Sequence, residues 1–411
     1  MRQEDLVAGL DLGGTKTSAV LAGLTGDKRT TGVKVLGVGT ARSSGVKRGI
    51  VRDIEETTNS IVRAMEDAER MAGVKASAVY CGIAGEHVRA QTSAGVAAVR
   101  GDEVTSEAVE RAHEGAKAIS LGTDRELLHA IPQEYSVDSH GGINDPIGMT
   151  GLRLEVEMYL ISVQSTAAQN LRKAVERAGY RVADMALSSL AASYSVLTGE
   201  EKELGCALVE VGGSSSDIAV FQDGKIRHLA SQPYAGAHVT SDIVQGLGVT
   251  QSNAEELKRL WGVAYQPLVD PDEMIELPGT PGQGIREARR ELLAHIIHER
   301  MDEIFRLALE SIESVGFVGK LPAGVVITGG VAQTPGIIEL AREVFAMPVR
   351  VGTPDQLISG IVDSVQTPQY AVPVGLALYG ARCRAHQDGA FAGAGVNKFF
   401  GPVKRWLQEF F

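Results

Sequence analysis

The sequence predicts a mixed α/β protein built from two lobes, and three observations support this prediction. Short apolar runs alternate with longer amphipathic stretches along most of the chain. A carboxylate followed by an apolar residue, two glycines and a hydroxyl residue occurs twice, at 11–15 and 210–214. A third apolar run, at 325–327, also leads to two consecutive glycines. The internal similarity indicates duplicated halves whose turns face one cleft.

The chain has 411 residues, of which 44% are hydrophobic and 22% charged, so it is long enough for several compact domains. The net charge of −11 argues against nucleic acid as a partner, because phosphates repel an acidic surface. Three scattered cysteines exclude a disulfide scaffold and a cysteine zinc cluster, and they fit a reducing cytosol. No apolar run reaches the roughly 18 residues of a membrane-spanning helix, and the first residues lack the layout of a signal peptide.

The predicted elements follow from hydrophobic spacing and from helix-stop signals. In the first part of the chain they are strands at 6–12, 18–21 and 78–83, a helix at 54–72 that stops at Gly73, and a helix capped by Thr105. Later they are a strand at 158–163, a helix that ends at Gly179, strands at 204–211, 217–221 and 325–327, and a long helix at 286–315. Prolines between 263 and 284 predict a surface loop, and residues 385–396 predict a flexible linker.

The glycine-rich turns have the chemistry of a phosphate site. Consecutive glycines carry no Cβ, so backbone N–H groups can approach an anion closely. Lys16 adds a positive charge suited to phosphate, and Asp11 and Glu210 have the oxygen ligands to hold Mg²⁺ directly or through its waters. One such turn alone would more often be a plain hairpin, but paired turns with paired carboxylates predict a nucleotide site. The candidate binding residues are Gly13, Gly14, Thr15, Lys16, Gly212, Gly213, Ser214, Ser215, Gly329 and Gly330.

The three turns, in this order, resemble the two phosphate loops and the adenosine loop of the actin/Hsp70/sugar-kinase superfamily. Segments at 127–135 (LLHAIPQEY) and 145–155 (DPIGMTGLRLE) are similar to the FtsA family of bacterial cell-division actin homologues, as are 203–205, 240–243 and 254–258. The resemblance covers nearly the whole chain from Gly9 onward. It implies an actin-like two-lobed ATPase fold, in which each lobe has a five-stranded mixed sheet and ATP with Mg²⁺ lies between the lobes.

The resemblance also implies how the chain is divided. Lobe 1 takes residues 1–83 and 163–204, and lobe 2 takes 205–240 and 326–384. A small subdomain inserted at 84–162 makes filament contacts and binds other division proteins. A helical subdomain at 241–325 binds the C-terminal peptide of the tubulin homologue FtsZ. Glu255 and Lys258 would face the nucleoside from one side of a helix, and a solvated ion pair is the alternative.

Three departures from the family pattern predict weak catalysis. Glu210 stands where the family has aspartate, and Ser214 stands where it has glycine. The helix near 187–191 offers no Gln or Glu to position an attacking water. A misplacement of about 1 Å can cost on the order of a hundredfold in rate. We therefore expect ATP binding with slow or negligible hydrolysis, and we assign no firm catalytic residue, although Asp11 and Glu210 are candidates.

The last residues, 397–411, predict an amphipathic helix that lies in a membrane interface. On a helix from Pro402 the apolar residues share a face, while Lys398, Lys404 and Arg405 oppose only Glu409. Each cation would contribute about 1 kcal/mol at anionic headgroups. A terminal helix docked on its own domain is the alternative. The predicted membrane residues are Phe399, Phe400, Val403, Lys404, Arg405, Trp406, Leu407, Phe410 and Phe411.

The resemblance implies a protein that polymerises on the cytoplasmic face of the inner membrane at mid-cell and tethers FtsZ filaments. A small-molecule (sugar) kinase and a pilus-assembly actin homologue are the alternatives. The kinase would need a phosphoacceptor pocket and a catalytic carboxylate, and the tail would then have no role. His129 is expected to be a packed structural residue. His295 and His298 are expected to be surface residues, because no third metal ligand is evident.

Overall fold

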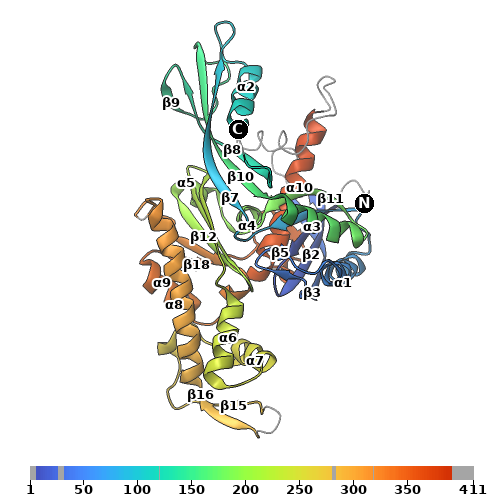
Figure 1. The fold of residues 1–411 in the computed structure, drawn as a ribbon, viewed down its shortest axis with the longest axis vertical. Helices are drawn as coiled ribbons and strands as arrows, with labels where there is room; N and C mark the ends of the chain where they lie inside the picture. Colours follow the sequence, from blue (N-terminus) through green and yellow to red (C-terminus); the bar gives the residue numbers. More distant parts are fainter. Residues whose placement is uncertain (1–5, 26–31, 120, 280–283, 318, 391–411) are drawn as a thin grey trace.

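The computed structural model describes residues 6–25, 32–119, 121–279, 284–317 and 319–390. Two lobes flank a central cleft, and an inserted subdomain and a helical subdomain extend in opposite directions from them (Figure 1). Within the described ranges, no helix is long and apolar enough to cross a membrane. The predicted membrane residues at 397–411 lie outside these ranges.

Lobe 1 is built on a six-stranded mixed sheet in the order β11-β6-β1-β2-β3-β19. β1, β2 and β3 form an antiparallel meander. The pairs β1–β6, β6–β11 and β3–β19 are parallel. The strands are β1 (Leu6–Leu12), β2 (Lys16–Thr25), β3 (Gly32–Arg42), β6 (Ala78–Ile83), β11 (Arg181–Leu187) and β19 (Ile358–Gly360). The hairpin of β4 (Val46–Lys47) and β5 (Ile50–Val51) and the helices α1 (Ile54–Ala72), α3 (Ser165–Arg177), α4 (Ser188–Val196) and α10 (Ala371–Ala390) complete the lobe.

Helix α1 has the predicted bounds because both of its ends are fixed locally. The Asp53 side chain accepts a hydrogen bond from the Glu56 N–H at the start, and Gly73 ends the helix in the left-handed region with a φ of 68°. Ile61 and Met65 are buried on the face that packs against β2 and β3. The apolar residues that recur at helical spacing in the sequence therefore form the buried face of α1.

Lobe 2 repeats the strand arrangement of lobe 1. Its sheet has the order β14-β13-β12-β17-β18, with an antiparallel meander followed by parallel neighbours. The same order occurs in lobe 1, where β3-β2-β1 is followed by β6 and β11. The elements are β12 (Cys206–Val211), β13 (Ser216–Gln222), β14 (Lys225–Gln232), β17 (Val325–Thr328), β18 (Val349–Val351), α5 (Gly199–Leu204) and α9 (Ile337–Phe345). The shared topology is that of two similar halves.

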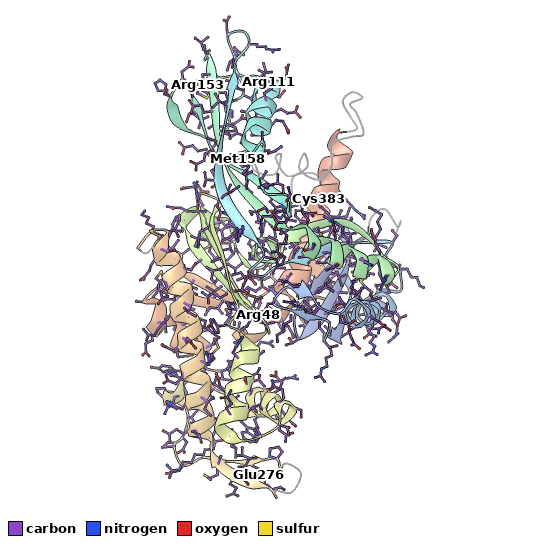
Figure 2. All side chains as sticks on the ribbon, in the orientation of Figure 1. Arg48, Arg111, Arg153, Met158, Glu276 and Cys383 are labelled. Atoms are coloured by element: carbon purple, nitrogen blue, oxygen red, sulfur yellow. The ribbon has the colours of Figure 1, made fainter. Side chains whose placement is uncertain are left out.

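The two subdomains lie at opposite ends of the molecule, as the labels of Arg111 and Glu276 show in Figure 2. The inserted subdomain consists of α2 (Ser106–Lys117) on an antiparallel sheet of β7 (Arg89–Ala98), β10 (Arg153–Gln164), β8 (Arg125–Val137) and β9 (His140–Ile143). The helical subdomain contains α6 (Gly236–Leu247), α7 (Gln251–Trp261), α8 (Arg290–Ser314) and the hairpin of β15 (Met274–Leu277) and β16 (Arg286–Arg289). Short 3₁₀ turns are η2 (Gln266–Leu268), η3 (Gly330–Gln333), η4 (Val362–Ser364) and η5 (Pro368–Tyr370).

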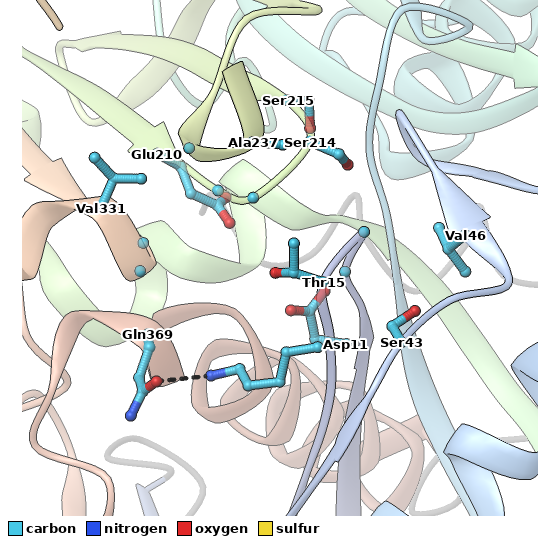
Figure 3. A pocket seen from close by; sticks show the side chains of 18 of the residues that line it. Asp11, Thr15, Ser43, Val46, Glu210, Ser214, Ser215, Ala237, Val331 and Gln369 are labelled. Atoms are coloured by element: carbon cyan, nitrogen blue, oxygen red, sulfur yellow. Dashed lines mark hydrogen bonds between the residues drawn. The ribbon is translucent and has the colours of Figure 1, made fainter. Parts of the chain in front are cut away.

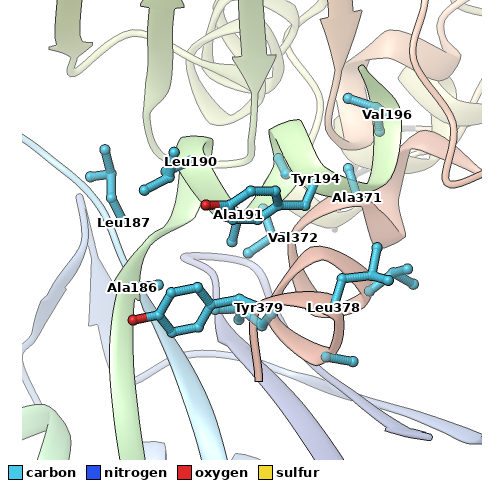
Figure 4. Close-up of a cluster of buried hydrophobic side chains, with 14 of the residues drawn as sticks. Ala186, Leu187, Leu190, Ala191, Tyr194, Val196, Ala371, Val372, Leu378 and Tyr379 are labelled. Atoms are coloured by element: carbon cyan, nitrogen blue, oxygen red, sulfur yellow. The ribbon is translucent and has the colours of Figure 1, made fainter. Parts of the chain in front are cut away.

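The assignment of all of 326–384 to lobe 2 is wrong, because the chain returns to lobe 1 after β18. β19 pairs with β3 and adds a sixth strand to the expected five, and α10 packs on β1 and α4. Two glycines permit this close approach, since a Cβ on Gly9 would lie 2.1 Å from the Pro373 carbonyl oxygen and one on Gly375 would lie 1.9 Å from that of Ala191. Figure 4 shows Leu378 and Tyr379 of α10 among the buried side chains of α4.

Three further predictions are wrong in part. The predicted linker at 385–396 is helical as far as Ala390, because residues 385–388 contain no glycine or proline that would stop α10. The remaining residues of that linker lie outside the described ranges. The predicted helix at 286–315 begins only at Arg290, and residues 286–289 form β16 instead. Ile275 and Leu277 are buried beside exposed Met274 and Glu276, an alternation that the flanking prolines obscured in the predicted loop.

Candidate nucleotide site

A cavity of about 1540 Å³ lies between the lobes and reaches the helical subdomain. Its walls come from the β1–β2 and β12–β13 turns, from α6 and α7, and from the turns that follow β17 and precede α10. Every residue that the sequence suggested for nucleotide or magnesium binding lines this cavity, including Glu255 and Lys258. The fold thus brings together segments that are far apart in the chain.

The two glycine turns have the same hydrogen-bonded form. In the first, the Gly13 N–H donates to the Lys16 carbonyl oxygen at 3.0 Å, and in the second the Gly212 N–H donates to the Ser215 carbonyl oxygen at 3.0 Å. A Cβ on Gly13 would lie 2.7 Å from the Lys16 carbonyl oxygen, so a side chain at that position would disrupt the first turn. Each lobe therefore presents one tight, glycine-dependent turn to the cleft.

The turns touch each other across the cleft. A Cβ built on Gly14 would lie 2.1 Å from Ser214 Oγ, and one built on Gly213 would lie 2.4 Å from Thr15 Oγ1. Figure 3 shows Ser214 and Thr15 reaching from opposite turns toward the middle of the site. Each turn thus uses a glycine to make room for a hydroxyl side chain of the other.

Three carboxylates gather behind the turns. Burial raises the pKa of Asp11 to about 6, while Lys16 lowers it and Asp217 raises it further. Burial, followed by the charges of Asp217 and Asp11, raises the pKa of Glu210 well above its ordinary range. The buried Oε2 of Glu210 has no hydrogen-bond partner among the described residues.

The carboxylates fit a hydrated divalent cation. A cation between the lobes would offset their mutual repulsion and satisfy Glu210 Oε2 through a water ligand. Within the described ranges, no group of three or more His, Cys, Asp or Glu side chains has the arrangement of a direct metal site.

Lys16 contacts the segment that precedes α10. Its Nζ donates to Gln369 Oε1 at 3.0 Å, drawn as the dashed line in Figure 3, and lies 4.9 Å from the ring centroid of Tyr370. Burial lowers the pKa of Lys16, and Asp11 opposes that effect. An anion such as a phosphate would supply a counter-charge to this buried cation.

Glu255 and Lys258 form a hydrogen-bonded group rather than a simple surface pair. Lys258 Nζ lies 2.6 Å from Glu255 Oε2 and donates to Thr240 Oγ1 at 2.8 Å, and Thr240 Oγ1 donates to the same Glu255 oxygen at 2.6 Å. Lys258 also donates to the Gly236 carbonyl oxygen at 3.2 Å, which joins α7 to the start of α6. The alternative of a fully solvated pair is wrong for Lys258, whose side chain is 17% exposed.

The third turn, which follows β17, forms another wall of the cavity. Gly329 has a φ of 88°, and a Cβ there would lie 2.5 Å from the Val211 carbonyl oxygen. The Gly329 N–H donates to the Pro368 carbonyl oxygen at 3.2 Å. Glycine at this position lets β17 end against the second glycine turn, and Gly330 then begins η3 beside the cavity.

Asp217, Thr240 and Gln369 are among the polar residues of the site that sequence reasoning missed. Asp217 lies four residues after Gly213, so its nearness to the second glycine turn could be read from the sequence. Thr240 lies in one of the similar segments, but its bond to Lys258 depends on how α6 and α7 pack. Gln369 carried no signal, because its partner Lys16 lies 353 residues away in the sequence.

The histidines take structural roles, as expected for His129. That ring is buried, and its Nε2 accepts a hydrogen bond from the Leu187 N–H at 3.0 Å. His295 is exposed, which agrees with its predicted surface position. His298 is half-buried, and its Nδ1 lies 3.0 Å from the Ala264 carbonyl oxygen, so the prediction for this residue is only partly right.

Comparison with known proteins identifies the family. The family model described as cell division protein FtsA matches residues 207–375, and the model described as the SHS2 domain inserted in FtsA matches residues 85–162. The FtsA protein of Pseudomonas aeruginosa is 38% identical over 98% of this chain and 97% of its own length. The chain belongs to the FtsA family. FtsA of Escherichia coli is 36% identical over 99% of this chain and 98% of its own length.

Solved structures agree on the actin-like fold. The chain is similar to a PilM–PilN type IV pilus biogenesis complex, with a TM-score of 0.66 and 15% identity over 91% of this chain and 98% of that one. It is also similar to MreB5 of Spiroplasma citri bound to ADP, with a TM-score of 0.56 and 13% identity over 94% of this chain and 99% of that one. As an FtsA-family member, the chain is an actin-like cell-division protein, which decides against the kinase and pilus alternatives.

Proposed function

We propose that this FtsA-family chain binds ATP with Mg²⁺ between its lobes and, in that state, assembles into filaments on the cytoplasmic face of the membrane at mid-cell. The observation that carries the proposal is the pair of matched glycine turns, each with a buried carboxylate behind it, that face one cavity from opposite lobes. The structure of the similar MreB5 bound to ADP supports a nucleotide as the ligand class.

Each wall of the cavity supplies a distinct part of the proposed site. The N–H groups of the two turns, with Lys16, would bind the phosphates. Asp11 and Glu210 would hold Mg²⁺ through its waters, and the metal would supply charge neutralisation for the phosphates. Glu255 and Lys258 would face the nucleoside from α7, opposite Gly329 and Gly330.

The remaining parts of the chain would make the division contacts. The helical subdomain at 241–325 would bind the C-terminal peptide of FtsZ, and the inserted subdomain at 84–162 would bind a second copy of the chain and other division proteins. The tail at 397–411 would hold the assembly on an anionic membrane surface. Family membership and the charge and aromatic pattern of the tail support this arrangement.

Calorimetric titration of the purified chain with ATP and Mg²⁺ tests the nucleotide site. We expect one site per chain, and Lys258→Ala should weaken it about tenfold, because it removes the cation that joins α6 to α7 at the cavity. The matched control is Lys75→Ala, at an exposed position outside the cavity.

We also expect slow hydrolysis, since Ser188 rather than Gln or Glu lines the cavity at the start of α4. Absence of binding by the wild-type chain, or turnover of several ATP molecules per second, would contradict these expectations.

A further inference from the structure

Ser214 lies where the lobes make their closest contact at the phosphate turns. The resemblance to the family implies a glycine at this position, whereas this chain has a serine. Ser214 Oγ occupies the space that Gly14 leaves open, since a Cβ on Gly14 would lie 2.1 Å from that oxygen and 2.4 Å from Ser214 Cβ. The side chain thus fills the gap between the two turns.

The Ser214 hydroxyl also bonds to a third turn. Its oxygen accepts a hydrogen bond from the Arg48 N–H of the β4–β5 hairpin at 3.3 Å. Arg48 and Gly49 have φ values of 51° and 74°, which direct this N–H across the cleft. Figure 2 labels Arg48 at the junction of the two lobes. One serine side chain of lobe 2 is therefore in contact with two turns of lobe 1.

These contacts bear on the length of the phosphate chain that the cleft accepts. A terminal phosphate held by both turns must lie between them, in the space that Ser214 fills, and would need the turns to separate. A shorter phosphate chain need not enter that space and would leave the Ser214 contacts intact.

We propose that Ser214 determines ligand specificity by favouring a nucleoside diphosphate over a nucleoside triphosphate. The inference rests on the proposed function, because it concerns the same cavity. Under this proposal a triphosphate enters only when the hydrogen bond to Arg48 breaks and the turns separate. Closure of the lobes at these turns then belongs to the diphosphate-bound chain.

Titration of the full chain with ADP and with the non-hydrolysable triphosphate AMPPNP, each with Mg²⁺, tests the proposal. The wild-type chain should bind ADP more tightly. Ser214→Gly should lower the AMPPNP-to-ADP ratio of dissociation constants about three- to tenfold, the effect of one hydrogen bond, with ADP affinity kept within about twofold. Ser214→Ala keeps Cβ and loses only the hydroxyl, so its ratio should lie between those of Ser214→Gly and the wild type.

Ser44→Gly is the matched control, because Ser44 lines the same cavity but donates its hydrogen bond to Glu56. In Ser44→Gly the AMPPNP-to-ADP ratio of dissociation constants should equal that of the wild type. An unchanged ratio in Ser214→Gly, with both nucleotides bound, would overturn the role of Ser214 and leave the nucleotide site standing. A wild-type chain that binds neither nucleotide would instead overturn the proposed function, and this inference with it.

Discussion

His129 is a residue whose burial has a consequence for stability in acid. Burial lowers its pKa to about 3, whereas an unfolded histidine takes up a proton near pH 6.5. The unfolded chain thus binds more protons than the folded chain between these values, so this residue's contribution to stability falls as the pH drops below about 6.5. Because of this proton linkage, the contribution of His129 to the free energy of unfolding should fall by about 2 kcal/mol between pH 7 and pH 5.

Urea unfolding of the wild type and of His129→Gln at pH 7 and pH 5 measures this loss. Glutamine keeps an acceptor for the Leu187 N–H and does not titrate, so the free energy of unfolding of the variant should fall by about 2 kcal/mol less than that of the wild type. The exposed His140 provides the control, as His140→Gln should follow the wild-type profile. Parallel pH profiles for the wild type and His129→Gln would show that His129 does not titrate as described.

At the residue scale, the sequence was informative where a function depends on neighbours in the chain. The glycine turns and their carboxylates lie within a few residues of one another, and all of them line the cavity. The Lys16–Gln369 and Ser214–Arg48 hydrogen bonds form only when distant segments meet, so no local sequence pattern predicts them. The clashes that Gly14 and Gly213 avoid also depend on a side chain supplied by the opposite turn.

At the scale of elements, one strand of lobe 2 is joined to the inserted subdomain. Lys225 on β14 is buried, and its Nζ donates to the Gln133 carbonyl oxygen at 2.7 Å and to Asn144 Oδ1 at 3.0 Å. Arg227, on the same strand, donates to Gln133 Oε1 at 3.1 Å. The inserted subdomain is covalently part of lobe 1, so these bonds couple its position to that of lobe 2.

Lys225→Met should loosen this connection, because methionine fills a similar volume but leaves a buried carbonyl oxygen without its donor. We expect a loss of about 1–3 kcal/mol in stability and faster hydrogen–deuterium exchange in the segments around Gln133 and Asn144. Lys75→Met, at an exposed position, is the matched control. Exchange in the inserted subdomain that matched the wild type would show that the two parts are not coupled through Lys225.

Elements with local end signals were predictable, and those fixed by packing were not. The bounds of α1 follow from Asp53 and Gly73, which are adjacent to the helix. The start of α8 does not, because residues 286–289 have a polar sequence and become a strand only by pairing with β15. α10 extends past the predicted linker boundary, and residues 385–388 contain no glycine or proline that would end it.

At the scale of the molecule, the chain crosses between the lobes several times. It leaves lobe 1 through α4 and α5, where Arg350 of β18 makes a bidentate ion pair with Glu201 and donates to the Val196 carbonyl oxygen at 2.7 Å. It returns through β19 and α10. The duplication was predictable from the repeated motif. The return of the chain to lobe 1 was not predictable, because the three residues of β19 pair with β3, which lies near the opposite end of the sequence. The chain connections between the lobes therefore lie at these crossings.

The proposed attachment to the membrane also belongs to this scale, and deletion of residues 397–411 tests it. We expect the truncated chain to lose cosedimentation with liposomes that contain anionic lipid, because it lacks the apolar face and the three cations of the tail. Calorimetric titration with nucleotide should be unchanged, since the truncated chain keeps every residue that is described as lining the cavity, and this result would verify that the truncated chain is folded. Cosedimentation equal to that of the full chain would contradict the anchor.

A charge-reversed tail separates the electrostatic contribution from the apolar one. In the variant with Lys398→Glu, Lys404→Glu and Arg405→Glu, the apolar residues remain. Loss of three cations at about 1 kcal/mol each should weaken binding to anionic liposomes about a hundredfold or more. Binding of the wild type should weaken similarly when the lipids are zwitterionic or the salt concentration is high, because screening removes the same attraction. If the wild type and the variant bound anionic liposomes equally, the cations would have no part in the attachment.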